Sequence, residues 1–284
     1  MFREYVKALF KRVDTRKLMQ FKPPALPARI YAKQMSVNKA HYQAFCKEVG
    51  WNHESQLHPL YLQMLSLPLQ MQCLLDKNSP FPLLGLIHCA NDVKIMAQCN
   101  IDMPFECRVK FSHVRAHNRG WEVDVSLQAF QSGQCVYHAV SSYLVKVKAV
   151  HVAPRPSQSE SNNVCVDSPK TKLATIEADA STGRRYAKIS GDYNPIHLYA
   201  LSARIFGFKR PIAHGMWTLA RAISLIPLEH EQTLATVSCR FKRPIFLPSQ
   251  INVFQITVDQ QRLSVEVTDI ENAHEHLVAD VTLR

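Results

Sequence analysis

Asp192 and His197 lie five residues apart in the run Ser190-Gly-Asp-Tyr-Asn-Pro-Ile-His197. Asn194 is a favoured N-cap and Pro195 suits the first helical position, so the run predicts a helix that begins there. Asp192 then lies in the turn before the helix. His197 lies in its first turn, where the positive end of the helix dipole disfavours imidazolium. A carboxylate beside a neutral imidazole can hold a water molecule and move its protons, which is general acid-base chemistry.

A structural interpretation of the same run competes with the chemical one. Ser-Gly-Asp-x-Asn-Pro is also typical of a turn that feeds a helix, with the Asp192 carboxylate accepting hydrogen bonds from nearby backbone N–H groups. Taken alone, the four residues from Asp192 to Pro195 favour the structural interpretation. The longer context favours chemistry.

Residues 186–197, 203–208 and 212–217 together resemble the hydratase signature of the MaoC-like, (R)-specific enoyl-CoA hydratase family. The resemblance extends from Lys172 to Arg284. It implies a hotdog fold, in which an antiparallel sheet wraps a central helix, and an activity on acyl thioesters. It also implies that Asp192 and His197 are the catalytic pair and that the Gly215 backbone N–H receives the thioester oxygen.

Gly215 has support that does not depend on the resemblance. It precedes an apolar run, residues 216–226, which predicts a helix ended by Pro227. The free N–H groups at such a helix start favour the negative charge of an enolate-like thioester, although ordinary helix-start geometry also explains a glycine here. Candidate substrate contacts close to these three residues are Ser190, Asn194, His214, Met216 and Trp217. For His214, a hydrogen bond to a neighbouring carbonyl is the more common role.

The fold class that follows is α+β, with two hotdog units in one chain. Residues 149–171 form a polar stretch rich in turn-forming residues, which predicts a linker between a unit at 1–148 and a catalytic unit at 172–284. The first unit repeats the order of the second. A helix-length run at 59–74, kinked by Pro68, precedes alternating strands that begin at 86–95. In the second unit, alternation over 251–253, 263–267 and 277–283 predicts half-buried antiparallel strands.

The first unit lacks the Ser-Gly-Asp-x-Asn-Pro-x-His run, and residues 50–53, Gly-Trp-Asn-His, are a weak echo of it. We therefore expect one active site per chain, in the second unit. Two roles for the first unit remain open. It either supplies a wall and room for the acyl chain, or it merely completes the sheet.

The net charge of +11 predicts an acidic partner. Coenzyme A carries phosphates and acyl carrier protein is acidic, so either is a candidate carrier of the substrate. Arg240 and Lys242, on the strand after the central helix, are the candidate phosphate contacts. Further candidates are Arg184, Arg185, Lys209, Arg210 and Arg243. Nucleic acid is not expected, because no zinc-finger spacing or RNA-binding aromatic motif is present.

The sequence favours chemistry without a cofactor. It contains no dinucleotide fingerprint and no P-loop, and His274-Glu-His276 is the one metal-like cluster, without a third ligand nearby. The eight cysteines never occur as Cys-x-x-Cys and predict free thiols in a reducing compartment. No integral membrane segment is expected, so the chain is expected in the cytoplasm, with a homodimer possible. Residues 2–13 are amphipathic and either dock on the body of the protein or touch an anionic membrane.

The expected function is that of a hydro-lyase of the EC 4.2.1 type. It would act as an (R)-specific enoyl-thioester hydratase or 3-hydroxyacyl-thioester dehydratase in acyl metabolism. The alternatives are a hotdog acyl thioesterase, in which a carboxylate activates water against the carbonyl carbon, and a non-catalytic acyl-thioester-binding assembly subunit.

Overall fold

The computed structural model describes residues 15–53, 56–83, 85–147, 169–229 and 231–284. The amphipathic segment 2–13 and nearly all of the predicted linker lie outside these residues. The predicted linker does not extend to residue 171, because strand β6 already begins at Lys170. The division into units at 1–148 and 172–284 stays our proposal.

The described strands form one antiparallel sheet in the order β1-β3-β4-β5-β2-β7-β10-β9-β8-β6. Read outward from the central pair, the first half runs β2-β5-β4-β3-β1 and the second half runs β7-β10-β9-β8-β6. Each half therefore has the same internal order, with its first strand at the outer edge. The strands are β1 (Tyr31–Met35), β2 (Ile87–Ile95), β3 (Phe105–His117), β4 (Gly120–Gln131), β5 (Gln134–Lys146), β6 (Lys170–Ala178), β7 (Leu234–Phe241), β8 (Ser249–Thr257), β9 (Arg262–Asp269) and β10 (Glu275–Leu283).

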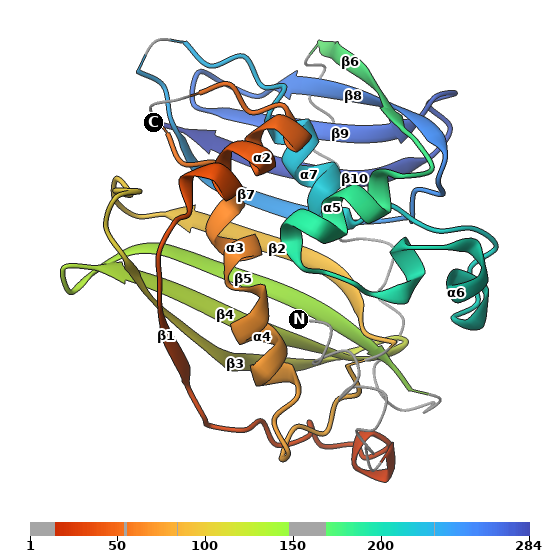
Figure 1. Ribbon diagram of the computed structural model, residues 1–284. Coiled ribbons are helices and arrows are strands. Elements are labelled where there is room, and N and C mark those ends of the chain that lie inside the picture. The colour runs from red at the N-terminus through yellow and green to blue at the C-terminus, as the bar shows by residue number, and fades with distance from the viewer. Residues whose placement is uncertain (1–14, 54–55, 84, 148–168, 230) are drawn as a thin grey trace.

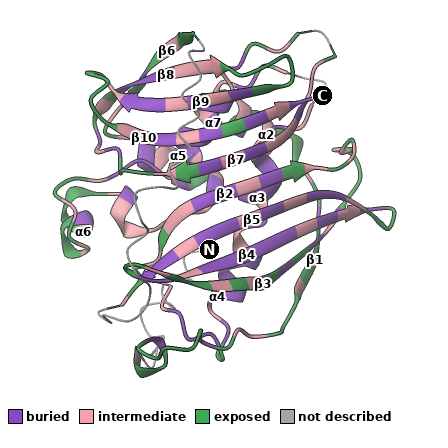
Figure 2. Cartoon of the chain, turned by 180° about the vertical axis from the view of Figure 1, so that it is seen from behind, coloured by how far each residue is buried: buried purple, intermediate pink, exposed green. Residues whose placement is uncertain are grey.

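Most of the helices lie against one face of this curved sheet (Figure 1), and Figure 2 shows the opposite, outer face. The first half contributes the 3-10 helix η1 (Thr15–Leu18) and helices α2 (Lys39–Val49), α3 (Tyr61–Leu65) and α4 (Leu67–Leu74). The second half contributes α5 (Thr182–Ser190), the 3-10 helix η3 (Pro195–His197), α6 (Ala200–Ile205) and α7 (Gly215–Ile223). This arrangement is a double hotdog fold, as the sequence predicted.

The central helix of the first half is broken where a proline was expected to kink it. Helix α3 ends at Leu65, and after Ser66 helix α4 begins at Leu67, with Pro68 in its first turn. In the second half, α7 ends at Ile223, earlier than the predicted end before Pro227. Residues 224–226 form turns, so the proline is not what ends this helix.

The two halves join through β2 and β7, which pair antiparallel from Ala90–Arg240 to Lys94–Thr236. We call this pairing the seam. The alternating strand predictions are confirmed on both sides of it. For example, Leu263, Val265 and Val267 of β9 are buried. The described cysteines form no disulfide, and none of the described helices is long and apolar enough to cross a membrane.

Glu48, near the end of α2, links the helices of the two halves. One of its carboxylate oxygens accepts from the indole N–H of Trp217 in α7, and the other accepts from Arg185 Nε in α5, both at 3.2 Å. Arg221 of α7 donates to the Val49 carbonyl oxygen at 3.0 Å. The Glu48 side chain is 13% exposed, so these contacts are partly shielded from water.

Glu48→Ala should lower the free energy of unfolding by about 1.5–3 kcal/mol, because the buried Trp217 N–H loses a charged acceptor. Urea denaturation followed by tryptophan fluorescence measures the change. Glu106→Ala is the matched control, since Glu106 pairs only with the exposed Arg108 and should cost less than about 1 kcal/mol. Equal losses for the two variants would contradict a linking role for Glu48.

Candidate active site

Asp192 is placed by the end of α5. The helix stops at Gly191, whose φ of 74° is a left-handed conformation that favours glycine. The Asp192 N–H donates to Ser190 Oγ at 3.1 Å, and Asp192 Oδ1 accepts from the Asn194 N–H at 3.2 Å. The turn of the structural interpretation is therefore present. It occupies Oδ1, while Oδ2 lies 3.9 Å from His214 Nε2.

The predicted helix start at Asn194 is confirmed, since the Asn194 side chain accepts from the Ile196 N–H. The helix itself is shorter than expected. It is the three-residue 3-10 helix η3, followed by a separate short helix, α6. The chain turns after His197 because the Ile196 carbonyl accepts from the Ile212 N–H and His197 Nδ1 bonds the Ile212 carbonyl at 2.7 Å.

Gly183 makes room for this turn on the side of α5. A Cβ at Gly183 would lie 2.0 Å from the carbonyl oxygen of His197. No side chain fits in that space. The glycine therefore lets the backbone of η3 lie directly against α5.

His197 is neutral for a reason other than the one the sequence suggested. A single 3-10 turn has too few aligned peptides to act through its dipole. Burial, followed by the neighbouring His214, lowers the pKa of His197 to about 3. Because Nδ1 must carry the proton that bonds the Ile212 carbonyl, the neutral ring has its lone pair on Nε2. His197 therefore offers a proton acceptor at neutral pH.

His214, the N-cap residue of α7, connects Asp192 and His197. Its ring stacks on that of His197 with centroids 3.7 Å apart, and its Nε2 donates to the Asp192 carbonyl oxygen at 3.0 Å. The expected bond to a neighbouring carbonyl is thus present. His214 Nδ1 is buried and has no hydrogen-bond partner in the structure. One side-chain nitrogen or oxygen from each of Asp192, His197 and His214 lies within 4.8 Å of the others. We call these three residues the acid-base cluster.

Gly215 is the first residue of α7, so its N–H has no acceptor inside the helix. The ring of Phe241, at the end of β7, lies against it. A Cβ at Gly215 would come within 2.9 Å of a Phe241 ring carbon. Glycine therefore leaves this amide approachable, with an aromatic ring beside it.

The first half of the chain also contributes to the site, as one of the two roles left open for it implied, through a residue that the sequence did not single out. His88, at the start of β2, stacks on Tyr143 with centroids 4.9 Å apart and meets Phe241 at 5.0 Å. Its Nε2 is buried without a hydrogen-bond partner, and burial lowers its pKa to about 4. The sequence placed His88 on a strand. It held no signal for the pairing across the seam that brings this strand to Phe241.

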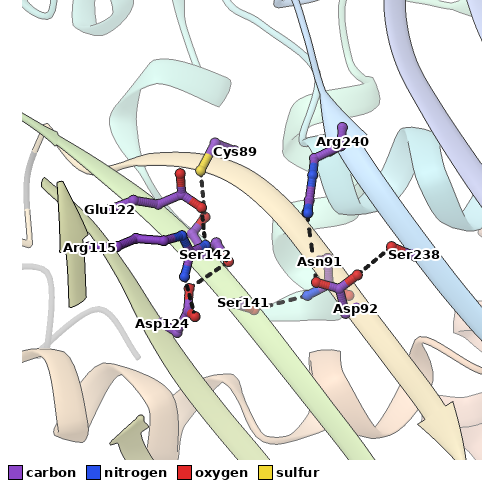
Figure 3. A network of polar contacts seen from close by, with 10 residues as sticks. All are labelled: Cys89, Asn91, Asp92, Arg115, Glu122, Asp124, Ser141, Ser142, Ser238 and Arg240. Atoms are coloured by element: carbon purple, nitrogen blue, oxygen red, sulfur yellow. Dashed lines mark hydrogen bonds and ion pairs between the residues drawn. The ribbon is translucent and has the colours of Figure 1, made fainter. Parts of the chain in front are cut away.

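Several predicted substrate contacts lie elsewhere. Trp217 is buried and donates to Glu48, so its indole belongs to the contact between the halves. Arg240 alternates with the buried Cys239 and therefore points to the outer face of the sheet, where it pairs with Asp92 at 3.7 Å (Figure 3). Lys242 pairs with the exposed carboxylate of Glu275. Each of these three side chains therefore contacts a residue outside the acid-base cluster.

The remaining candidates stay close to the cluster. Ser190 and Asn194 hold the turn of Asp192 through the bonds described above, and Met216 follows Gly215 as a half-buried residue of α7. Among the basic candidates, Arg184 donates to the Leu198 carbonyl oxygen after η3, and Arg185 pairs with Asp179 and Glu48. These two arginines therefore brace the helices around the site.

The acid-base cluster contains residue types that also bind metal ions. The two histidine rings, however, stack on each other, with centroids 3.7 Å apart and 27° between their planes, and stacked rings do not direct their in-plane lone pairs toward each other. A metal ion needs lone pairs that converge on one point. One nitrogen of each ring is already bonded to a backbone carbonyl. The geometry favours proton transfer over metal binding.

The architecture defines a class, namely double-hotdog proteins with an Asp-His pair in the second unit. Residues 161–278 match the model of the MaoC like domain family. The second half of the chain is therefore similar to MaoC-like domains.

Known proteins that are similar to most or to part of the chain carry related names. The chain is 25% identical over 262 residues to the 3-hydroxyacyl-thioester dehydratase X of Mycobacterium tuberculosis, covering 90% of each chain. It is 41% identical over 63 residues to the peroxisomal enoyl-CoA hydratase 2 of Arabidopsis thaliana, covering 21% of this chain and 20% of that one. The crystal structure of HtdX from Mycobacterium tuberculosis shares the fold, with a TM-score of 0.74 and 24% identity, over 89% of this chain and 99% of that chain.

The buried histidines predict a loss of stability in acid. The pKa of His197 is about 3 in the folded chain, below the ordinary value near 6.5, so between these values the unfolded chain binds a proton that the folded chain does not. Stability is then fully present above about pH 6.5 and falls as the pH drops toward 3, by about 1.4 kcal/mol per pH unit for each such histidine.

Urea denaturation at pH 6 and pH 5 measures how steeply the free energy of unfolding depends on pH. His197→Asn should reduce this slope by the contribution of about one proton. His113→Gln, at an exposed position on β3, is the control and should leave the slope unchanged. A His197→Asn slope equal to that of the parent would contradict a neutral buried His197.

Proposed function

We propose that the chain is a hydro-lyase that adds water to a trans-2-enoyl thioester, or removes it from an (R)-3-hydroxyacyl thioester. The observation that carries this proposal is the acid-base cluster next to the amide of Gly215. The MaoC-like domain and the names of the similar proteins support it.

The cluster suits the hydration step because its two proton-handling groups can both act as acceptors. His197 offers the lone pair of Nε2, and Asp192 offers a carboxylate oxygen. In hydration, the water oxygen forms its bond to C3 and one water proton passes to this pair. The π electrons of the C2–C3 bond move toward the thioester oxygen, beside the Gly215 N–H. The pair then returns the proton to C2, so atoms and charge balance within one site.

The reverse direction uses the same groups. The pair removes a proton from C2, the enolate-like charge develops beside Gly215, and the proton is delivered to the departing 3-hydroxyl, which leaves as water. Asp192, His197 and Gly215 are the proposed catalytic residues. Ser190, Asn194 and His214 are the proposed positioning residues, because they hold the turn and the rings.

Asp192→Asn and His197→Ala should each lower turnover by about 10²–10⁴-fold, because each removes a proton acceptor at the reacting atoms. Loss of the enoyl absorbance of crotonyl-CoA measures hydration. Circular dichroism checks that both variants remain folded. Full activity in either variant would remove that residue from the mechanism.

A thioesterase on the same fold would also need a carboxylate and water, but it would release a free thiol. Parallel assays with a thiol reagent and with the enoyl absorbance therefore separate the two activities on one sample. We expect hydration without thiol release. Thiol release that depends on Asp192, without hydration, would establish the thioesterase, and binding without either reaction would establish the non-catalytic binder.

The chemistry proposed here uses no cofactor, and the substrate is carried as a coenzyme A or phosphopantetheine thioester. The choice between acyl-CoA and acyl carrier protein, the cytoplasmic location and the homodimer stay predictions from the sequence. Since Arg240 and Lys242 are paired away from the cluster, the phosphate contacts are better sought among Lys209, Arg210 and the segment around α6.

A further inference from the structure

A cavity of about 410 Å³ lies at the opposite end of the seam from the acid-base cluster. The cluster lies near the end of β7, at Phe241, and the start of β2, at His88. The cavity is lined by the end of β2, at Ile95, and the start of β7, at Thr233 and Leu234. Because β2 and β7 run antiparallel, the two places are related by the internal repeat of the fold.

The chain around the cavity repeats the turn that holds the catalytic carboxylate. Helix α2 ends at Gly50 with φ 73°, as α5 ends at Gly191 with φ 74°. Each glycine N–H donates to the carbonyl of the residue four positions earlier. Trp51 then stands in the position of Asp192. The weak echo at residues 50–53 is therefore a real structural repeat.

The approach to the central helix is repeated as well. His214 and Gly215 lead into α7, and His58 and Pro59 lead into α3. The ring of His58 packs on Trp51 with centroids 4.7 Å apart, much as His214 contacts Asp192. Pro59 has no N–H, and the N–H groups of Leu60 and Tyr61 donate to Nδ1 and to the carbonyl oxygen of His58, so these residues offer no free donor like that of Gly215.

In the described part of the first half, no segment corresponds to the one that carries His197. Tyr42 lies on α2 eight residues before Gly50, as Gly183 lies eight residues before Gly191. The hydroxyl of Tyr42 donates to the Gln56 carbonyl oxygen and accepts from the His58 N–H. Among the residues that the structure describes, the first-half site therefore has neither a carboxylate in the position of Asp192 nor a histidine in the position of His197, yet it keeps an open cavity.

The lining fits a molecule with an apolar body and a polar head. Leu57, Pro59, Ile95 and Leu234 supply apolar walls. Gln98 and Arg284 supply polar groups, and the Arg284 guanidinium donates to Thr233 Oγ1 and to the Ile95 carbonyl oxygen, which uses two of its five N–H donors. The volume is within the usual range for small-molecule sites, about 300–1,000 Å³.

We propose that this cavity is a second, non-catalytic acyl-binding site, which holds an acyl chain with its carbonyl or carboxylate head toward Arg284. The proposal rests on the proposed function for the choice of ligand alone. A second site differs from an extension of the catalytic site that holds the acyl chain of the reacting substrate, because a second site predicts a second bound molecule per chain.

The test uses the full chain with Asp192→Asn, so that turnover does not interfere, and decanoyl-CoA, whose saturated chain cannot be hydrated. Isothermal titration calorimetry should give two molecules bound per chain. Leu57→Trp and Gln98→Trp, each made separately in this background, place an indole in the cavity from half-buried and exposed positions and should reduce the count to one. Met96→Trp is the matched control, since Met96 is exposed beside Ile95 outside the lining, and it should keep two. Thermal melts check the fold of each variant.

Sodium decanoate, titrated in parallel, distinguishes the source of the acyl group. Decanoate that occupies one cavity-dependent site per chain supports the proposal with the free acid as ligand, and a cavity-dependent site for decanoyl-CoA supports it with the thioester. One molecule of each ligand per chain in all variants would overturn it. A single site weakened by Leu57→Trp for decanoyl-CoA but not for butyryl-CoA would also overturn it, because the cavity would then be the far end of the catalytic acyl channel. Wild-type hydration of crotonyl-CoA is measured separately, so failure of the proposed function and failure of the second site are different results.

Discussion

The pairing of β2 with β7 is the constraint on which the pockets at both ends of the seam depend. Hydrogen bonding between backbones fixes which residues lie opposite each other, from Ala90–Arg240 to Lys94–Thr236. That register brings His88 of the first half against Phe241 of the second, and it brings Ile95 near Leu234 at the other end. Neither half could form its pocket alone, because each pocket takes one wall from the other half.

Burial, more than charge, sets the chemistry of the site. His197 and His88 lose most of their contact with water, and this desolvation keeps both imidazoles neutral. The single hydrogen bond from His197 Nδ1 to the Ile212 carbonyl then decides which nitrogen can accept a proton. The stacking of His214 on His197 fixes the plane in which that lone pair lies. Burial, the hydrogen bond to Ile212 and the stacking of His214 together orient one proton acceptor.

The sequence predicted the fold class, the positions of the main strands along the chain, and the placement of Asp192 and His197 near a helix start, because these depend on local patterns. Alternation marked the half-buried strands, and Asn194 with Pro195 marked the start of η3. The sequence failed where contacts between distant segments decide. Trp217 and Arg240 are close in the chain to the catalytic residues, but packing turns one toward Glu48 and strand alternation turns the other to the outer face. His88 was missed for the same reason, since no local pattern encodes a pairing between halves.

The contrast between Gly183 and Tyr42 shows how strongly the two halves differ at corresponding positions. Gly183 has no side chain, so the backbone at His197 lies directly against α5. The phenol ring of Tyr42 fills the corresponding space on α2, and its hydroxyl is hydrogen-bonded to the neighbouring backbone. An acidic residue at position 51 would not by itself create an acid-base site, because the Tyr42 side chain occupies the space that a loop carrying the partner base would need. A variant designed to place an acid-base pair in the first half would therefore need a small residue at position 42 as well as an acidic residue at position 51.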